Sequence, residues 1–224
     1  MNDTLFREYL NSWVGNNYTF AALLAVVILC AWGVAAWHHL RRGQAFLQAA
    51  GQSVRGEMVN IRPPGARGFF VHVQPPPDPF LHLALTFQIT ANPVEWLFWL
   101  LMGRQTQLVI QATLRERPRA ELIWQRGKIP GRALSRAGSP TLWVQQHLDF
   151  LRYEYATRGI NTGAIVHVFT DLQTRFGPLL EKVSIQADAR PEVEIVLRTN
   201  GLNPEEIPAL ITTIRSAGRA ALLR

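Results

Sequence analysis

The sequence is poor in the residues that many metal proteins and enzymes depend on. Its 224 residues include one cysteine, Cys30, and only two lysines, Lys128 and Lys182. A single cysteine excludes an intrachain disulfide and the zinc sites that are built from several thiolates. Glycine-rich phosphate loops, the GxSxG nucleophile motif and the HExxH zinc motif are also absent. We therefore expect no catalytic, cofactor or metal site, and no small-molecule substrate is indicated.

Charge is missing from one long stretch, which runs from Tyr18 to Trp37. As an α-helix this stretch extends about 30 Å, roughly the thickness of the hydrocarbon core of a bilayer. Tyr18, Trp32 and Trp37 stand near its ends, where aromatic rings favour the membrane interface. A buried core helix would show a polar stripe, and a signal peptide would begin with a basic segment before a shorter apolar run. The sequence therefore predicts a transmembrane helix over residues 18–37.

Basic residues flank this stretch on its C-terminal side. Arg41 and Arg42 follow it, whereas residues 1–17 contain two acids and one arginine. Because positively charged flanks stay in the cytosol, we expect residues 1–17 to be extracytosolic and the chain after residue 37 to be cytosolic. The preference for arginine over lysine favours the inner or plasma membrane of a prokaryote.

The rest of the chain carries short strand and helix patterns, which predict a stem or linker over residues 38–60 and one α+β domain over residues 61–224. The expected strands are 69–74, 81–89, 105–114, 119–125, 179–186 and 193–198, and the expected helices begin near residues 93, 161 and 204. Residues 141–155 fit either a strand or a helix. We expect antiparallel strands with helices packed on one face, and a hairpin joining strands 105–114 and 119–125.

Positive charge is concentrated between Arg104 and Arg136, where eight basic residues accompany two acids. The predicted contact residues in and beside the loop 127–140 are Arg126, Lys128, Arg132 and Arg136. Such a cluster on a tethered domain attracts anionic lipid headgroups or RNA, including that of the ribosome. A solvated surface that keeps the domain soluble is the alternative interpretation.

A second apolar segment, residues 93–102, is too short to span a bilayer. Asn92 and Pro93 predict the start of a helix, and Trp96, Phe98 and Trp99 follow. The helix is either buried in the core or is a contact helix that lies among headgroups or grips a transmembrane segment of a client protein. We take the three aromatic residues as candidate contact residues.

Histidine and aspartate occur close together at two places. His147 precedes Asp149, and His167 precedes Asp171. These groups would form an acid–base site only if the fold brought them together. Ordinary surface or hydrogen-bonded histidines are the commoner explanation of such a pattern.

Two stretches of the domain carry a resemblance to a known family. In LALTFQITANPVEWLFWLLMGRQTQLVIQATL (Leu83–Leu114) a strand precedes an apolar helix and an alternating strand, and in GAIVHVFTDLQTRFGPLLEKVSIQAD (Gly163–Asp188) a helix precedes an alternating strand. With the last strand and helix (Glu194–Leu222), this order resembles calumin-like proteins, the coiled-coil-domain membrane proteins of the endoplasmic reticulum in the PAT translocon complex. The chain lacks that family's long acidic luminal region and charged coiled-coil tail. The resemblance implies a role near the machinery of membrane-protein insertion.

The sequence thus favours a non-enzymatic, single-pass, membrane-tethered adaptor or assembly factor for the insertion or folding of membrane proteins. Its expected partners are membrane lipids, a membrane-protein client or complex subunits, and the ribosome or anionic headgroups. An accessory structural subunit of a larger membrane complex is the alternative. A membrane-bound enzyme is the third hypothesis.

Overall fold

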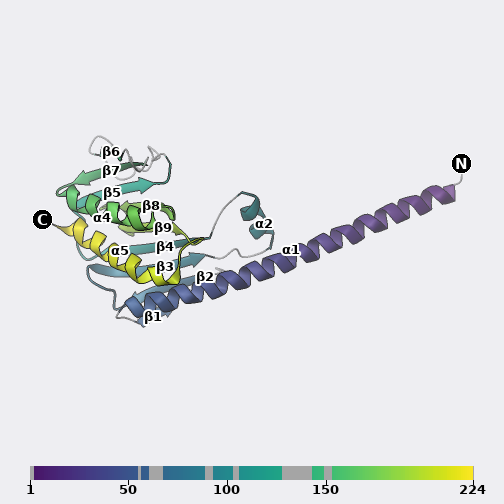
Figure 1. Ribbon diagram of the computed structural model, residues 1–224, viewed down its shortest axis with the longest axis horizontal. Helices are drawn as coiled ribbons and strands as arrows, with labels where there is room; N and C mark the ends of the chain where they lie inside the picture. Colours follow the sequence, from purple (N-terminus) through teal and green to yellow (C-terminus); the bar gives the residue numbers. More distant parts are fainter. Residues whose placement is uncertain are drawn as a thin grey trace. The chain divides into compact units, whose positions relative to one another are not determined.

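The computed structural model describes residues 3–54, 57–60, 68–88, 93–102, 106–127, 143–148 and 153–223 (Figure 1). The chain divides into two compact units. One comprises residues 1–41 and 90–104, and we call it the apolar unit. The other comprises residues 42–89 and 105–224, and we call it the sheet domain.

The apolar unit contains most of α1 (Asp3–Ser53), which continues as one helix past the predicted end of the span. Within the part of the chain that the structure describes, the segment Asn17–Ser53 is long and apolar enough to cross a membrane. Its large apolar side chains are exposed, as Phe20 (68%) and Val27 (62%) illustrate. Among the described residues of the unit, these side chains have no protein cover and face the solvent.

The sheet domain is built on one antiparallel sheet, with nine strands among the described residues in the order β1-β2-β3-β4-β9-β8-β5-β7-β6. The strands are β1 (Glu57–Asn60), β2 (Gly68–Gln74), β3 (Phe80–Gln88), β4 (Gln107–Leu114), β5 (Ala120–Gln125), β6 (Val144–Leu148), β7 (Tyr153–Gly159), β8 (Leu180–Ile185) and β9 (Val193–Arg198). Every second residue of β4 and β9 is buried, which is typical of strands with one face on a core. The α+β class and the antiparallel strands agree with the sequence prediction.

Two helices, α4 (Thr162–Phe176) and α5 (Ile207–Leu222), lie across one face of this sheet (Figure 1). A 3-10 turn, η2 (Pro204–Glu206), precedes α5, and Asn203 and Glu206 form a reciprocal capping box there. Apolar residues at helical spacing in α5, including Leu210 and Ile214, are buried in the core cluster. The helical spacing of apolar residues in the sequence therefore indicates both helices and the buried face of α5.

The end of α1 belongs to the sheet domain, which differs from the predicted stem over residues 38–60. Phe46 is only 4% exposed and packs against Phe87 of β3, with ring centroids 5.9 Å apart. Ala50 is also in the core cluster, and the Arg42 guanidinium donates a hydrogen bond to the carbonyl oxygen of Leu202 at 2.9 Å. The compact domain therefore begins at Arg42 rather than at residue 61.

The predicted hairpin between strands 105–114 and 119–125 is wrong. These segments are β4 and β5, and the hairpin of β8 and β9 lies between them. β4 pairs with β3 and β9, whereas β5 pairs with β7 and β8. The inner residues of β9 (Val193, Ile195 and Leu197) are fully buried, in keeping with its place at the centre of the sheet. The short link between β4 and β5 crosses the sheet end instead of forming a turn.

Candidate functional site

The helix α2 (Pro93–Leu101) presents an apolar surface that its own unit does not cover. It begins at Pro93 as predicted, while Asn92 lies outside the described residues. None of its residues is buried. Phe98 is 52% exposed, and Trp96 and Trp99 are half-buried. This exposure is compatible with the contact interpretation, which stays a prediction for Trp96, Phe98 and Trp99.

Arg126, one of the predicted anionic contacts, is used by the fold. Its guanidinium donates hydrogen bonds to the carbonyl oxygens of Leu180 (3.0 Å), Gly177 (3.0 Å) and Pro178 (2.6 Å), and it forms an ion pair with Glu181 at 3.3 Å. These carbonyls follow the end of α4, where unpaired acceptors favour a cation. The donors of Arg126 are therefore engaged within the domain and have little capacity for a ligand.

The other three predicted basic contacts, Lys128, Arg132 and Arg136, lie outside the described residues. Arg126 is the last basic residue before the loop, and its amide donates to the carbonyl oxygen of Glu181. The anionic-contact hypothesis stays a prediction for these three residues.

His167 and Asp171 line a groove of about 720 Å³ between α4 and α5. The Asp171 carboxylate accepts a hydrogen bond from Arg175 at 3.0 Å, one turn further along the same helix. The backbone of His147 lies in β6, opposite Glu154, whereas its side chain and Asp149 are not among the described parts of the chain. The structure therefore pairs Asp171 with a cation and gives the acid–base hypothesis no added support.

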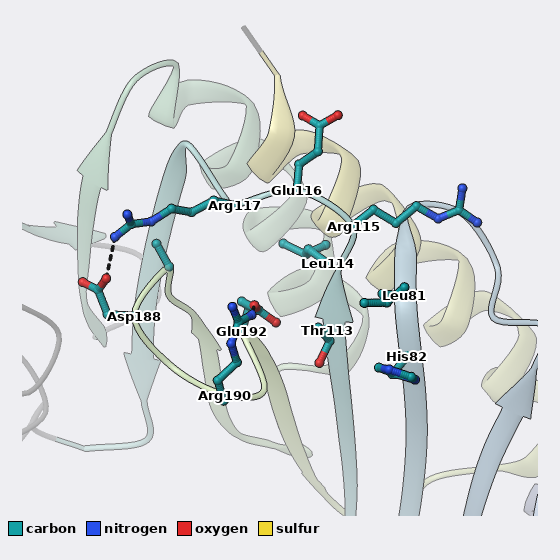
Figure 2. Close-up of a pocket in the computed structure, with 11 residues that line it drawn as sticks. Leu81, His82, Thr113, Leu114, Arg115, Glu116, Arg117, Asp188, Arg190 and Glu192 are labelled. Carbon is teal, nitrogen blue, oxygen red and sulfur yellow. Dashed lines mark hydrogen bonds and ion pairs between the residues drawn. The ribbon is translucent and has the colours of Figure 1, made fainter.

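A second groove, of about 630 Å³, lies at the sheet end where β3 begins and β4 ends (Figure 2). Its charged lining residues are Arg115, Glu116, Arg117, Asp188, Arg190 and Glu192. Arg117 extends toward Asp188, and their Nη2 and Oδ1 atoms are 2.5 Å apart (Figure 2). Arg190 forms an ion pair with the buried Glu192. Two of the three arginines are therefore paired with carboxylates of the groove, whereas Arg115 donates a hydrogen bond to the carbonyl oxygen of Phe80 at 3.3 Å.

A buried ion pair continues this arrangement into the domain. The Arg158 guanidinium donates to both carboxylate oxygens of Glu121, with the shortest contact at 2.7 Å, and to Asp188 at 3.2 Å. It also lies over the ring of Trp143 at 5.0 Å. Burial lowers the pKa of Arg158, but the hydrogen bonds and charges of Glu121 and Asp188 together raise it above its ordinary value. Arg158 therefore stays cationic and links Glu121 to the groove.

The sequence analysis missed this network. A single glutamate in the otherwise apolar strand AELIWQ was the available signal, because a buried acid requires a partner. The identity of that partner depends on β7, whose pairing with β5 places Arg158 opposite Glu121. Within the described residues, no group of three or more histidine, cysteine or acidic side chains could hold a metal ion.

Comparison with known proteins assigns no family to this chain. No protein-family model matches it, and no curated protein matches its sequence.

Proposed function

We propose that this protein is a single-pass membrane protein whose sheet domain works in the cytosol as a non-enzymatic adaptor in membrane-protein assembly. The observation that carries the proposal is that the two parts of α1 differ in the exposure of their apolar side chains. Its apolar part exposes Phe20, Leu23 and Val27, whereas its last turns bury Phe46 and Ala50 in the domain core. One helix thus supplies both an anchor and a structural element of the tethered domain.

The exposed part of α1 supports the anchor on energetic grounds. Burying one large apolar side chain contributes roughly 1.5–3 kcal/mol, and a surface with many such side chains requires a cover. A bilayer fits this cover because the helix is long enough to cross it and satisfies its own backbone hydrogen bonds. The Arg41 guanidinium stacks on the ring of Trp37, with its carbon atom 4.0 Å from the ring centroid. An aromatic ring and a cation of this kind suit the headgroup region of a membrane.

The two ends of the sheet support the adaptor role. We call the end with Gln88, Gln107 and Arg198 the proximal end, because Arg42 of α1 bonds to Leu202 there. The charged groove lies at the opposite, distal end, roughly 26 Å away along the eight residues of β4. The ion pairs Arg117–Asp188 and Arg190–Glu192 of the distal end are the candidate contacts for a partner in the cytosol.

Cross-linking in native membranes tests this proposal. A photoactivatable amino acid would replace Glu116, which is exposed at the charged groove, and Thr212, which is exposed on α5, would serve as the matched control position. We expect the probe at residue 116 to capture ribosomal proteins or membrane proteins during their assembly, and the control to capture few of them. Capture of neither class would contradict the adaptor role.

Co-purification from the same membranes addresses the accessory-subunit alternative. Stable, stoichiometric co-purification with one membrane complex would favour that alternative over a role in assembly. Extraction of the membranes at alkaline pH gives an independent reading of the anchor. We expect the full chain to stay with the lipid, and its release would contradict a membrane span.

A further inference from the structure

The exposed apolar surface of α2 covers a wide arc of the helix. Val94, Phe98, Leu100 and Leu101 are each at least half exposed, as is Met102 just after the helix. At 100° per residue, the four positions within the helix span about 160° of its circumference, an arc that also contains the half-buried Leu97. A helix that is apolar nearly all round is normally buried in a protein core or in a membrane, and no residue of α2 is buried within the protein.

The chain reaches α2 from the proximal end of the sheet. It leaves after Gln88 and re-enters at Gln107, which lies opposite Arg198 of β9. Five Cα–Cα steps join Gln88 to Pro93, so the chain can carry the start of α2 at most about 18 Å from the end of β3. The apolar helix therefore cannot act far from the proximal end.

The end of α1 enters the sheet domain at the same place. A Cβ atom on Gly43 would overlap the ring of Phe69 and lie 3.2 Å from the ring of Phe87, so this glycine permits the helix to approach β2 and β3 closely. Phe69 and Phe87 are paired in register near the proximal ends of those strands. Arg42 follows Trp37 after only five helical steps, a rise of about 8 Å along the helix. If α1 spans the bilayer, the proximal end lies at the headgroups.

We propose that α2 inserts into the lipid leaflet next to the sheet domain and forms a second membrane contact beside α1. This inference rests on the proposed membrane span of α1. Nine residues extend about 14 Å, less than half of the hydrocarbon thickness, so α2 enters from one side and does not cross. Trp96 and Trp99 supply rings that favour the interface. Pro93 lacks an amide hydrogen, which leaves one donor fewer to satisfy at the helix start.

Lipid accounts for this surface better than a protein groove does. A partner helix or groove covers one stripe of a helix, whereas acyl chains cover every side that they reach. The exposed arc of about 160° is wider than such a stripe. Glu95 is the only charged residue of α2 and stands in its first turn, where a negative charge is favoured by the helix dipole.

The test uses the purified full chain in vesicles of phosphatidylcholine alone, which contain no client protein. Cys30 is replaced by serine, and a polarity-sensitive fluorophore is attached to Phe98→Cys or to Leu81→Cys. Both native side chains are 52% exposed, and Leu81 lies in β3 of the sheet domain, so it is a matched control. We expect the label at residue 98 to emit at shorter wavelength, to resist aqueous iodide and to be quenched by nitroxide-labelled lipid. The label at residue 81 should show the reverse.

A second variant separates insertion from folding. Trp96→Asp combined with Trp99→Asp should restore iodide quenching at residue 98 and leave the unfolding midpoint of the sheet domain unchanged. Equal iodide quenching at residues 98 and 81 in the parent chain would overturn the proposal. So would protection that appears only in native membranes, which indicates a protein client, or protection that disappears on dilution of the protein in lipid, which indicates a second copy.

The failure of this inference can be distinguished from failure of the proposed anchor. In the chain that retains Cys30, a membrane-impermeant maleimide reports on α1 alone. Protected Cys30 with a water-exposed residue 98 overturns the insertion of α2 and leaves the anchor standing. Labelled Cys30 overturns the anchor, and with it the basis for placing α2 at the same membrane.

Discussion

The two units of this protein use the same apolar residue types in opposite ways. In the sheet domain, Phe80 is fully buried and Phe46 nearly so. In the apolar unit, Phe20 and Phe98 are more than half exposed. Burial in water stabilises the first arrangement, whereas the second requires a solvent or a partner that is itself apolar. This difference in exposure indicates that the two units are suited to different environments.

The boundary between these environments falls within a single helix. α1 has no break between Arg41 and Arg42, where one unit ends and the other begins. Beyond this point Phe46, Ala50 and Val54 recur every four residues and are all buried. This spacing gives the helix one inner face toward the sheet, in place of the uniform apolar surface that precedes it.

The largest expected effect comes from moving the N-terminus across this boundary. A chain that begins at Arg42 should stay folded, because it retains the packed turns of α1. A chain that begins after Val54 should not fold, because loss of Phe46 alone is expected to remove about 3–5 kcal/mol from a typical domain stability of about 5–15 kcal/mol. Circular dichroism and gel filtration compare the two chains. If both chains had the same circular dichroism spectrum and elution volume, the end of α1 would be only a linker.

A second comparison sets a buried ion pair against an exposed one. Arg158→Ala leaves Glu121 buried without its cation and should lower the free energy of unfolding by about 3–5 kcal/mol. Arg175→Ala removes an exposed pair with Asp171 in α4 and should change it by about 0.3–0.5 kcal/mol. Denaturant titration of both variants in the same detergent measures the two values. Similarly small changes in the free energy of unfolding of both variants would mean that the buried Glu121 does not require Arg158 as its partner.

A third comparison separates structural from contact arginines. Arg126→Ala removes three hydrogen bonds to the carbonyls after α4 and should lower the free energy of unfolding by about 1–3 kcal/mol. Neutral replacements of Lys128, Arg132 and Arg136 should leave stability unchanged and weaken salt-sensitive binding to anionic liposomes or ribosomes. If binding persists without these three cations, the basic loop is not the contact.

The smallest effect at neutral pH concerns Tyr155, which is buried beside Phe169. Burial raises the pKa of Tyr155 above its ordinary value of 10.0. The folded state therefore keeps the phenolic proton where the unfolded chain loses it. This contribution to stability is complete below pH 10.0 and is lost as the pH rises through the folded-state pKa. The free energy of unfolding, measured from pH 8 to pH 11, should fall less steeply with pH for Tyr155→Phe than for the parent chain.

Local periodicity predicted the long apolar helix, six strands, α4 and the capped start of α5. It did not predict which strands pair, because pairing depends on the match between distant strands. The β8–β9 hairpin displaced the expected pairing of β4 with β5 for this reason. The packing of Phe46 on Phe87 and the bonding of Arg158 to Glu121 were missed for the same reason, since each joins residues far apart in the sequence.

Labelling of Cys30 tests the membrane span most directly. This sole cysteine is exposed on the surface of α1, so the protein itself does not shield it. We predict that a membrane-impermeant maleimide leaves Cys30 unlabelled in intact vesicles from either side and labels it after the lipid is dissolved in detergent. Labelling of Cys30 in intact vesicles at the rate seen in detergent would contradict the span.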